Sequence, residues 1–274
     1  MPPRVIAVLA VAIAAVSAAG VLVRLAPDAH PLALAFWRTA VVALVLAPAA
    51  RRLPARDLVW IGLAGALLAF HFWAWFASLR LTTVMRSTVF VCLTPVWAGL
   101  GEAVLLRAAP RPRYWIGVTV ALLGVGGLAG TGGTADWRGD LLAIGGGLLS
   151  AGYLLIGRSV RPRVDIATYG SAVCGAAALT LLGLGLALGV PFLGHPTATW
   201  LAIAGMALGP QLIGHIGFNY AVRYVPAAIV GAVILLEPVG ATALAALVLG
   251  ERPQLTDLLG GATILVGVGI AITG

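Results

Sequence analysis

The stretch Leu93-Thr94-Pro95-Val96 returns 143 residues further along the chain as Leu236-Glu237-Pro238-Val239. The same ungapped shift superposes residues 77–126 on residues 220–269. It pairs Arg80 with Arg223, Pro110 with Pro253, Gly117 with Gly260, and Gly124-Val125-Gly126 with Gly267-Val268-Gly269. Two unrelated hydrophobic segments share leucine and alanine by chance, but not proline, arginine and glycine in register. The pattern therefore indicates one ancestral unit that was duplicated.

The composition around this repeat is typical of a protein embedded in a membrane. Of the 274 residues, 61% are hydrophobic and 9% are charged, whereas soluble domains carry about 25% charged residues. Apolar runs of about 20 residues, long enough to cross a hydrocarbon core of roughly 30 Å, follow one another with short polar breaks. They predict ten spans, at residues 4–23, 32–50, 58–78, 84–106, 114–130, 140–158, 167–189, 200–221, 227–249 and 256–273. The spans leave no room for a soluble domain.

The formal charge of +8 comes from 17 basic residues, all arginine, most of which fall in the short breaks. The breaks on the same side as both termini carry Arg51, Arg52, Arg56, Arg107, Arg111, Arg113, Arg158, Arg161, Arg163 and Arg223. The breaks on the other side carry Arg24, Arg80, Arg138 and Arg252. Because arginine-rich loops stay in the cytoplasm, we expect both termini to be cytoplasmic. The charge then sets the topology, and we expect no nucleic-acid partner.

Each half of the chain, residues 1–133 and 134–274, is predicted to hold five spans. Because five is odd, the second half inserts upside down relative to the first. The predicted fold is an all-α integral membrane protein of ten transmembrane helices, arranged as two inverted five-helix repeats. Transporters built from inverted repeats bind substrate near the middle of the membrane and move one half against the other.

The first span also has features of a signal peptide. Arg4 precedes an apolar run that ends in the small residues Val16-Ser17-Ala18-Ala19. The repeat needs this segment as its first helix, so we expect it to stay in the protein.

Several motifs of the second half resemble a known family. They are Leu235-Leu236-Glu237-Pro238-Val239, Leu249-Gly250-Glu251-Arg252-Pro253, Leu259-Gly260-Gly261 and Gly267-Val268-Gly269. They look like the end of the second repeat in EamA-like, ten-span members of the drug/metabolite transporter superfamily, and Phe36-Trp37-Arg38 is similar to the first-repeat pattern. The first half departs from the pattern, because it reads Arg107-Ala108-Ala109 where Gly-Glu-Arg is expected. A role of Glu251 is therefore not expected twice.

The resemblance implies a secondary transporter in a bacterial inner membrane that uses an ion gradient to export or exchange small metabolites. Amino acids, purine derivatives and toxic compounds are the substrates it implies. We expect an exporter of amino acids or related compounds, working by alternating access, and not an enzyme. A multidrug or toxic-compound efflux carrier is the alternative, and an intramembrane enzyme or a channel would be of another class.

Four ionisable residues lie inside predicted spans, namely Arg38, Arg86, Glu102 and Glu237. An unpaired charge there costs about 2.5–3.5 kcal/mol, so each must pair, protonate or reach water. Glu237 lies near the middle of its span, and Pro238 leaves the Ile234 carbonyl without its helical donor. We therefore expect a polar cavity at Glu237, which acts either as a proton carrier or as the counter-charge to a substrate amine or an arginine.

Each of the other three has two interpretations. Arg38 either extends to the membrane surface as an anchor or contacts substrate or a gate. Arg86 either anchors the protein at the interface or has a role in transport. Glu102 either caps a helix or pairs with Arg107, or else has a role in transport.

A polar stripe runs along the predicted span at 200–221. Gln211, His215 and Asn219 are spaced i, i+4, i+8 and so share a helical face, with Tyr220 beside them. The repeat maps this stripe onto Leu68, Phe72 and Phe76, with His71, Trp73 and Trp75 adjacent. The predicted substrate-binding residues are Trp37, Arg38, His71, Trp75, Thr94, Gln211, His215, Asn219, Tyr220 and Glu237. The alternative is that the polar side chains bond neighbouring helices and that the aromatic ones face lipid or pack against other helices.

No catalytic residue, metal site or cofactor is predicted. Cys92 and Cys174 lie in apolar runs without partner spacing and are interpreted as small buried hydrophobic residues. The glycines of the spans at 114–130 and 256–273 have spacings typical of close helix packing. Ser17, Ser150 and Tyr153 add hydroxyls that most simply bond their own helices. The expected partners are a small-molecule substrate, the lipid bilayer and, if Glu237 carries protons, a coupling proton.

Overall fold

The computed structural model describes residues 1–82, 84–128, 136–249 and 254–273. These residues form helices and contain no strand. The first half contains α1 (Pro3–Val16), α2 (Ala19–Arg24), α3 (Pro31–Leu46), the 3-10 turn η1 (Ala47–Ala49), α4 (Ala55–Leu81), α5 (Val84–Val91), α6 (Thr94–Leu105) and α7 (Pro112–Leu128). The second half contains α8 (Trp137–Val160), α9 (Ile166–Ala187), α10 (Thr197–Met206), the π-helix η2 (Ala207–His215), α11 (Ile216–Ala221), α12 (Ala227–Ile234), α13 (Glu237–Leu249) and α14 (Leu255–Ile272).

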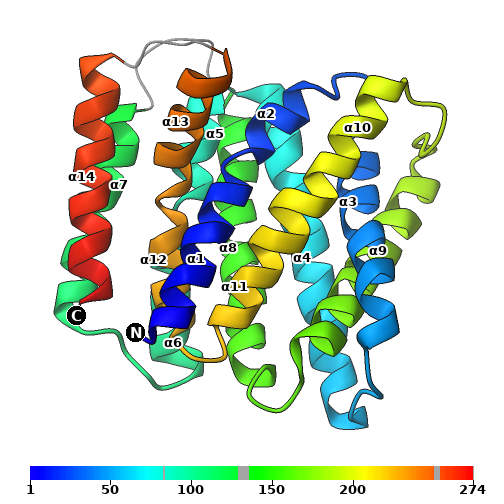
Figure 1. The fold of residues 1–274 in the computed structure, drawn as a ribbon, viewed down its shortest axis with the longest axis horizontal. Coiled ribbons are helices and arrows are strands. Elements are labelled where there is room, and N and C mark those ends of the chain that lie inside the picture. Colours follow the sequence, from blue (N-terminus) through cyan, green and yellow to red (C-terminus); the bar gives the residue numbers. More distant parts are fainter. Residues whose placement is uncertain (83, 129–135, 250–253, 274) are drawn as a thin grey trace.

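The helices run between two ends of the molecule, and both termini lie at the lower end in Figure 1. We call this the terminal end and the other the far end. The loops after α3, α6, α8 and α11, which together with the adjoining helix ends carry ten of the 17 arginines, also lie at the terminal end. The structure thus groups the arginine-rich loops with the termini, as the charge pattern predicts.

Nine segments of the described chain are long and apolar enough to cross a membrane. They are Pro3–Arg24, Pro31–Ala49, Ala55–Leu81, Arg86–Leu105, Trp137–Val160, Ile166–Ala187, Thr197–Ala221, Ala227–Leu244 and Leu255–Ile272. The remaining predicted span, at 114–130, corresponds to α7, which is 17 residues long and shorter than the others. Ten spans, and their inverted arrangement, stay predictions.

The repeated motif marks a helix break in each half. The first break separates α5, which ends at Val91, from α6, which begins at Thr94, and the second separates α12 from α13 between Ile234 and Glu237. The shift of 143 residues maps one break onto the other. Pro95 and Pro238 each follow in the first turn of the new helix, where a missing N–H leaves no helical hydrogen bond unmade.

The first helix of each half crosses the broken helix of the other half. The Ser17 hydroxyl, between α1 and α2, donates to the carbonyls of Ile13 (2.8 Å) and Glu237 (3.2 Å). The Thr94 hydroxyl donates to Gly147 of α8 at 3.2 Å. The Ser17 hydroxyl thus bonds another helix in addition to its own. Because both breaks are held across the two halves, they meet near the centre of the bundle.

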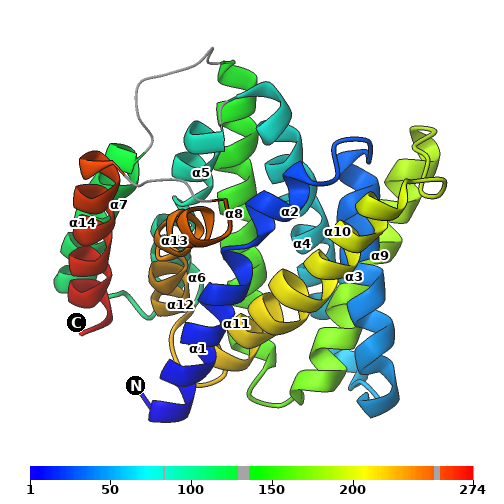
Figure 2. The ribbon, with the colours of Figure 1, turned by 45° about the horizontal axis from the view of Figure 1, so that its top comes forward.

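The helices α7 and α14 lie side by side at one edge of the bundle (Figures 1 and 2). A Cβ on Gly117 would overlap backbone atoms of Ala271 and Gly267, and a Cβ on Gly124 would lie 2.7 Å from the Gly260 oxygen. The order of these contacts means that the two helices run in opposite directions. The predicted role in close packing is confirmed for Gly117, Gly124, Gly260 and Gly267, whereas nothing lies within 4 Å of the Cβ positions of Gly126 and Gly269.

Two of the charged residues have partners in the other half of the chain. Arg86 forms an ion pair with Asp140 of α8 at 2.5 Å, and Asp140 also accepts a hydrogen bond from Thr82 at 3.1 Å. Glu102 accepts a hydrogen bond from the Ala227 amide at 2.6 Å. It therefore caps a helix as expected, but that helix is α12 of the other half. The alternative of pairing with Arg107 is wrong, because the carboxylate faces inward, where the α12 amide is its partner.

The glycine contact can be tested with two substitutions in α14. Gly267→Ala should lower the free energy of unfolding by about 1–3 kcal/mol, because the new methyl group overlaps the Ala121 backbone. Gly269→Ala is the matched control, because nothing lies within 4 Å of its Cβ position and alanine favours helix. Thermal unfolding of both variants in detergent should separate them. Equal effects would contradict the packing described here.

Candidate functional site

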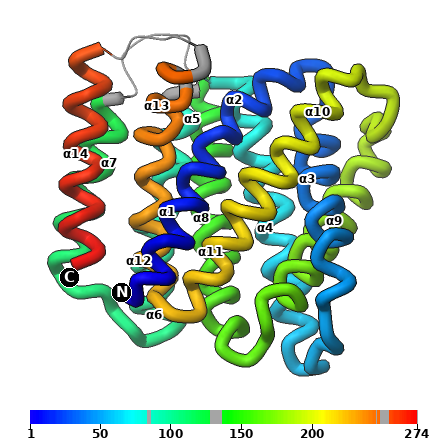
Figure 3. The backbone as a smooth tube through the Cα atoms, in the orientation of Figure 1, coloured from blue at the N-terminus to red at the C-terminus, as the bar shows by residue number. Residues whose placement is uncertain are grey.

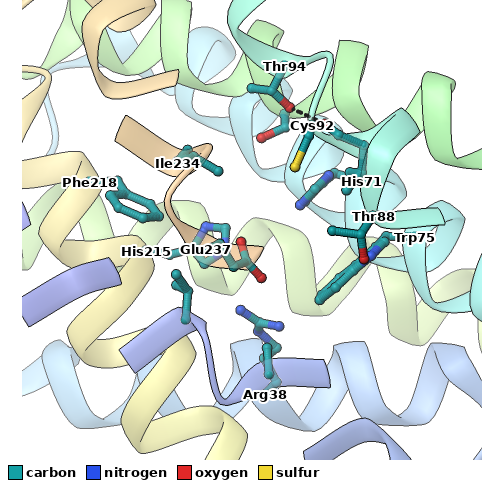
Figure 4. A pocket seen from close by; sticks show the side chains of 14 residues that line it. Arg38, His71, Trp75, Thr88, Cys92, Thr94, His215, Phe218, Ile234 and Glu237 are labelled. Carbon is teal, nitrogen blue, oxygen red and sulfur yellow. Dashed lines mark hydrogen bonds between the residues drawn. The ribbon is translucent and has the colours of Figure 1, made fainter. Parts of the chain in front are cut away.

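The helix breaks enclose a small cavity at the centre of the bundle (Figure 4). Its volume of about 50 Å³ is enough for a few water molecules or a small polar group. It is lined by Val16, Ala19, Arg38, His71, Trp75, Thr88, Val91, Cys92, Thr94, Ser150, His215, Phe218, Ile234 and Glu237. Both halves of the chain contribute to its wall.

Arg38 of α3 is 1% exposed and lines this cavity. Its Nε donates to the Gln211 Oε1 at 2.8 Å, and its guanidinium carbon lies 3.9 Å from the centre of the Phe72 ring, a favourable cation–π distance. Its Nη1 is buried and has no hydrogen-bond partner. The interpretation of Arg38 as a surface anchor is wrong, because the residue lies on the buried face of α3 with Leu34 and Val42.

Gln211 lies behind the cavity wall and holds Arg38 in place. It is fully buried, and its Nε2 donates to the Cys174 sulfur at 3.5 Å. It belongs to η2, a π-helix that contains Pro210. Wider π turns are common at functional sites. Cys174 is free and buried, as predicted.

Glu237, the first residue of α13, lines the cavity from the other half of the chain. Figure 4 shows its carboxylate and the Arg38 guanidinium pointing into the same space. None of the salt bridges in the described part of the chain includes either residue. The cavity therefore holds one basic and one acidic side chain that point into the same space and form no ion pair with each other.

Nitrogen atoms without partners gather around this space. Six buried side-chain atoms in the described residues lack a hydrogen-bond partner, and three of them belong to cavity-lining residues, namely Arg38 Nη1, Trp75 Nε1 and His215 Nδ1. Leaving a buried polar group unpaired costs about 1–3 kcal/mol, so such groups call for a ligand or water. Two other polar side chains of the wall are already bonded, because His71 Nδ1 donates to the Gly146 carbonyl at 2.8 Å and the Thr94 hydroxyl donates to the Val91 carbonyl at 2.8 Å.

A second cavity leads from this site towards the far end. Its volume is about 330 Å³, and it shares Trp75, Thr88 and Glu237 with the central cavity. It extends past Phe76 and Leu79 to Arg24, Pro27 and Arg80, in the α2 and α4 ends at the far end of the bundle (Figure 3). We call it the vestibule. Glu237 lies where the vestibule meets the central cavity.

The structure divides the ten predicted binding residues into two groups. Arg38, His71, Trp75, Thr94, His215 and Glu237 line the central cavity. Gln211, Asn219, Trp37 and Tyr220 do not. The substrate-binding role of the first group stays a prediction.

Each of the four others has a structural partner elsewhere. Gln211 bonds Arg38, and Asn219 accepts a hydrogen bond from Tyr153 at 2.5 Å. Trp37 donates to the Phe192 carbonyl at 2.7 Å, and the Tyr220 ring packs on Tyr224 at 5.0 Å. The π turn between Gln211 and His215 also changes the spacing that the predicted stripe assumed.

The binding residues predicted from the sequence do not include every residue that lines the central cavity. Thr88, Cys92, Phe218 and Ile234 line the cavity without having been selected as binding residues. Their closeness to the two proline-marked breaks is the signal that would have identified Cys92 and Ile234. The motif at 249–253 lies outside the described residues, apart from Leu249.

Comparisons with known proteins match nearly the whole chain to one protein family. The model of the EamA-like transporter family matches residues 4–130 and 137–273. The Bacillus subtilis (strain 168) protein named Uncharacterized transporter YwfM is 27% identical over 266 residues, which cover 91% of this chain and 87% of that protein. An Archaeoglobus fulgidus protein named Uncharacterized transporter is 35% identical over 92 residues, 33% of this chain and 34% of that protein. A crystal structure with 21% identity superposes with a TM-score of 0.82, covering 100% of this chain and 98% of that one, which shows the fold.

The contact between Gln211 and Arg38 can be tested by a double-mutant cycle. Gln211→Leu should lower the free energy of unfolding by about 1–3 kcal/mol, because it leaves a buried guanidinium without its partner. Adding Arg38→Met should recover part of this loss, because removing both polar groups leaves none unpaired. Thermal unfolding in detergent measures both effects. Additive losses in the double variant would contradict the coupling.

Proposed function

The chain belongs to the EamA-like transporter family, and we propose that it is a secondary carrier that exports amino acids or related small compounds across a bacterial cytoplasmic membrane. Its relatives are named transporters. The observation that carries the proposal is the pair of opposite charges, Arg38 and Glu237, that share one cavity without bonding each other.

A zwitterionic substrate complements this cavity. A carboxylate at Arg38 Nη1 would complete the guanidinium's hydrogen bonds, and charge-assisted bonds of this kind are among the strongest in proteins. An ammonium group at Glu237 would satisfy the carboxylate at the vestibule side. A substrate with both groups neutralises both charges, whereas a substrate with only one leaves the other charge unpaired, at a cost in binding.

The position of the cavity supports transport by alternating access. In this structure the central cavity joins the vestibule, which leads to the far end. With the termini in the cytoplasm, this is the state that faces outward and releases an exported substrate. The two breaks lie beside the cavity, where a movement of one half against the other would change the side from which it is reached.

Glu237 also offers a simple way to couple transport to protons. Its carboxylate borders the vestibule and so reaches water on that side. A proton and a substrate ammonium would compete for the same carboxylate, so that one leaves as the other binds. This competition would drive export at the expense of a proton gradient.

A multidrug carrier is the alternative that the aromatic walls favour, because Trp75 and Phe218 offer apolar surface. A cavity of about 50 Å³ with two unpaired charges fits a small charged molecule better than a bulky apolar cation.

Counterflow in liposomes tests the proposal. A panel of amino acids is compared with N-acetyl and amide derivatives, each of which lacks one charge. We expect saturable counterflow of at least one amino acid. Its derivatives should compete about tenfold less well or worse, the factor that corresponds to roughly 1.4 kcal/mol.

Glu237→Gln should abolish this transport or remove its pH dependence, because the amide cannot exchange an ammonium for a proton. Asp140→Asn is the matched control, since this acidic residue pairs with Arg86 and does not line the central cavity. Wild-type rates and an unchanged pH profile in Glu237→Gln would refute the role of Glu237. Preference for bulky cations would favour the multidrug alternative, and conduction without saturation would indicate a channel.

A further inference from the structure

The buried carboxylate of Glu102 lies outside the lining of the central cavity. This residue of α6 is 4% exposed, and its Oε1 accepts the Ala227 amide proton at 2.6 Å. Ala227 is the first residue of α12, and Pro226, the residue before it, supplies no side-chain cap. The cap of α12 therefore comes from the other half of the chain, and a negative charge is favourable at that end of a helix.

Tyr114 of α7 adds a second contact at the same place. Its side chain is buried, and its hydroxyl lies 2.7 Å from the Pro95 carbonyl and 3.2 Å from the Ala228 carbonyl. Pro95 belongs to the first helix break, and Ala228 is the second residue of α12. The first half thus holds the start of α12 through two polar contacts at the terminal end.

The repeat-related position at the far end carries no carboxylate, and the start of α5 is held there by a different residue of the other half, Asp140, which accepts from Thr82 and pairs with Arg86. The shift of 143 residues maps Glu102 onto Ala245 and Ala227 onto Val84. Alanine has no side-chain oxygen to accept an amide proton. The far end is also where the vestibule of about 330 Å³ lies. The Glu102 cap of α12 and the vestibule therefore lie at opposite ends of the bundle.

A third cavity borders the capped helix at the terminal end. It has a volume of about 630 Å³, and its lining includes Glu102, Leu106, Tyr114, Arg158, Ala228 and Ile229. Glu102 thus borders an open space even while it caps α12. If α12 moved away, water in this space would solvate the carboxylate, and two basic residues, Arg111 and Arg158, line the same space. Breaking the hydrogen bond to Ala227 would therefore not leave the Glu102 carboxylate unsolvated in an apolar core.

We propose that Glu102 is the latch of the terminal end: its bond to the Ala227 amide holds α12 against α6 and keeps the outward-facing state closed to the cytoplasm. Tyr114 supports the latch. Release of α12 opens a path from the terminal-end cavity towards the central cavity. This inference rests on alternating access in the proposed function, but not on the identity of the substrate.

Site-directed labelling in both membrane orientations tests the latch. The background carries Cys92→Ser and Cys174→Ser, and single cysteines are introduced by Ala241→Cys in the vestibule or Ile229→Cys in the terminal-end cavity. An impermeant thiol reagent is applied to right-side-out and inside-out vesicles. Glu102→Ala should speed labelling at position 229 and slow it at position 241. We expect the ratio of the two rates to change by about tenfold, which corresponds to roughly 1.4 kcal/mol.

Two further variants separate a latch from a general support of the fold. Tyr114→Phe should shift the ratio in the same direction by less, and Glu102→Gln, which keeps an acceptor oxygen without the charge, should lie between wild type and Glu102→Ala. Faster labelling at both positions would mean loss of packing and would overturn the latch, as would unchanged labelling at both. Because labelling needs no substrate, reciprocal rates without amino-acid transport would overturn the substrate class alone, whereas amino-acid transport without reciprocal rates would overturn the latch alone.

Discussion

A charge inside a membrane protein must find an opposite charge, hydrogen bonds or water, and the centre of this bundle is arranged around one arginine. Arg38 is held by Gln211 on one side and by the Phe72 ring on another, while one of its nitrogens is left without a partner. Such a residue is stable only if the rest of the cavity supplies compensation. Glu237 supplies the opposite charge across the cavity, and we propose that substrate supplies the missing contact.

The duplicated sequence explains why this cavity lies where the two halves meet. Each half contributes a helix that is broken before a proline, and each break is held by a hydroxyl contact between the halves. The equivalent helix breaks create the central cavity, whereas sequence differences between the halves supply its charged groups. Glu237 stands where the first half has Thr94, and Glu102 stands where the second half has Ala245. In our account the first difference concerns binding and the second concerns access.

The helices and the position of the cavity could be predicted from the sequence. The length of an apolar run and the position of a proline both act on the local backbone. Hydrophobic runs predicted nine segments that the structure contains, and the Glu-Pro motif located the break beside the cavity. The inward direction of a side chain depends instead on which helices pack against it. Trp37 and Tyr220 lie on helices that line the cavity or adjoin it, yet they turn to Phe192 and Tyr224. The cap of Ala227 by Glu102 joins residues 125 positions apart, and no local pattern in either segment predicts it.

We propose that substrate binds in the cavity between Arg38 and Glu237, and Cys92 provides a native reporter of whether this cavity is occupied. This thiol lines the cavity, so the rate at which a small alkylating reagent modifies it in a Cys174→Ser protein reports whether the cavity is filled. We expect a transported amino acid to slow the modification in a saturable way, and its N-acetyl and amide derivatives to have little effect at the same concentration. Equal rates with and without the transported amino acid would contradict the claim.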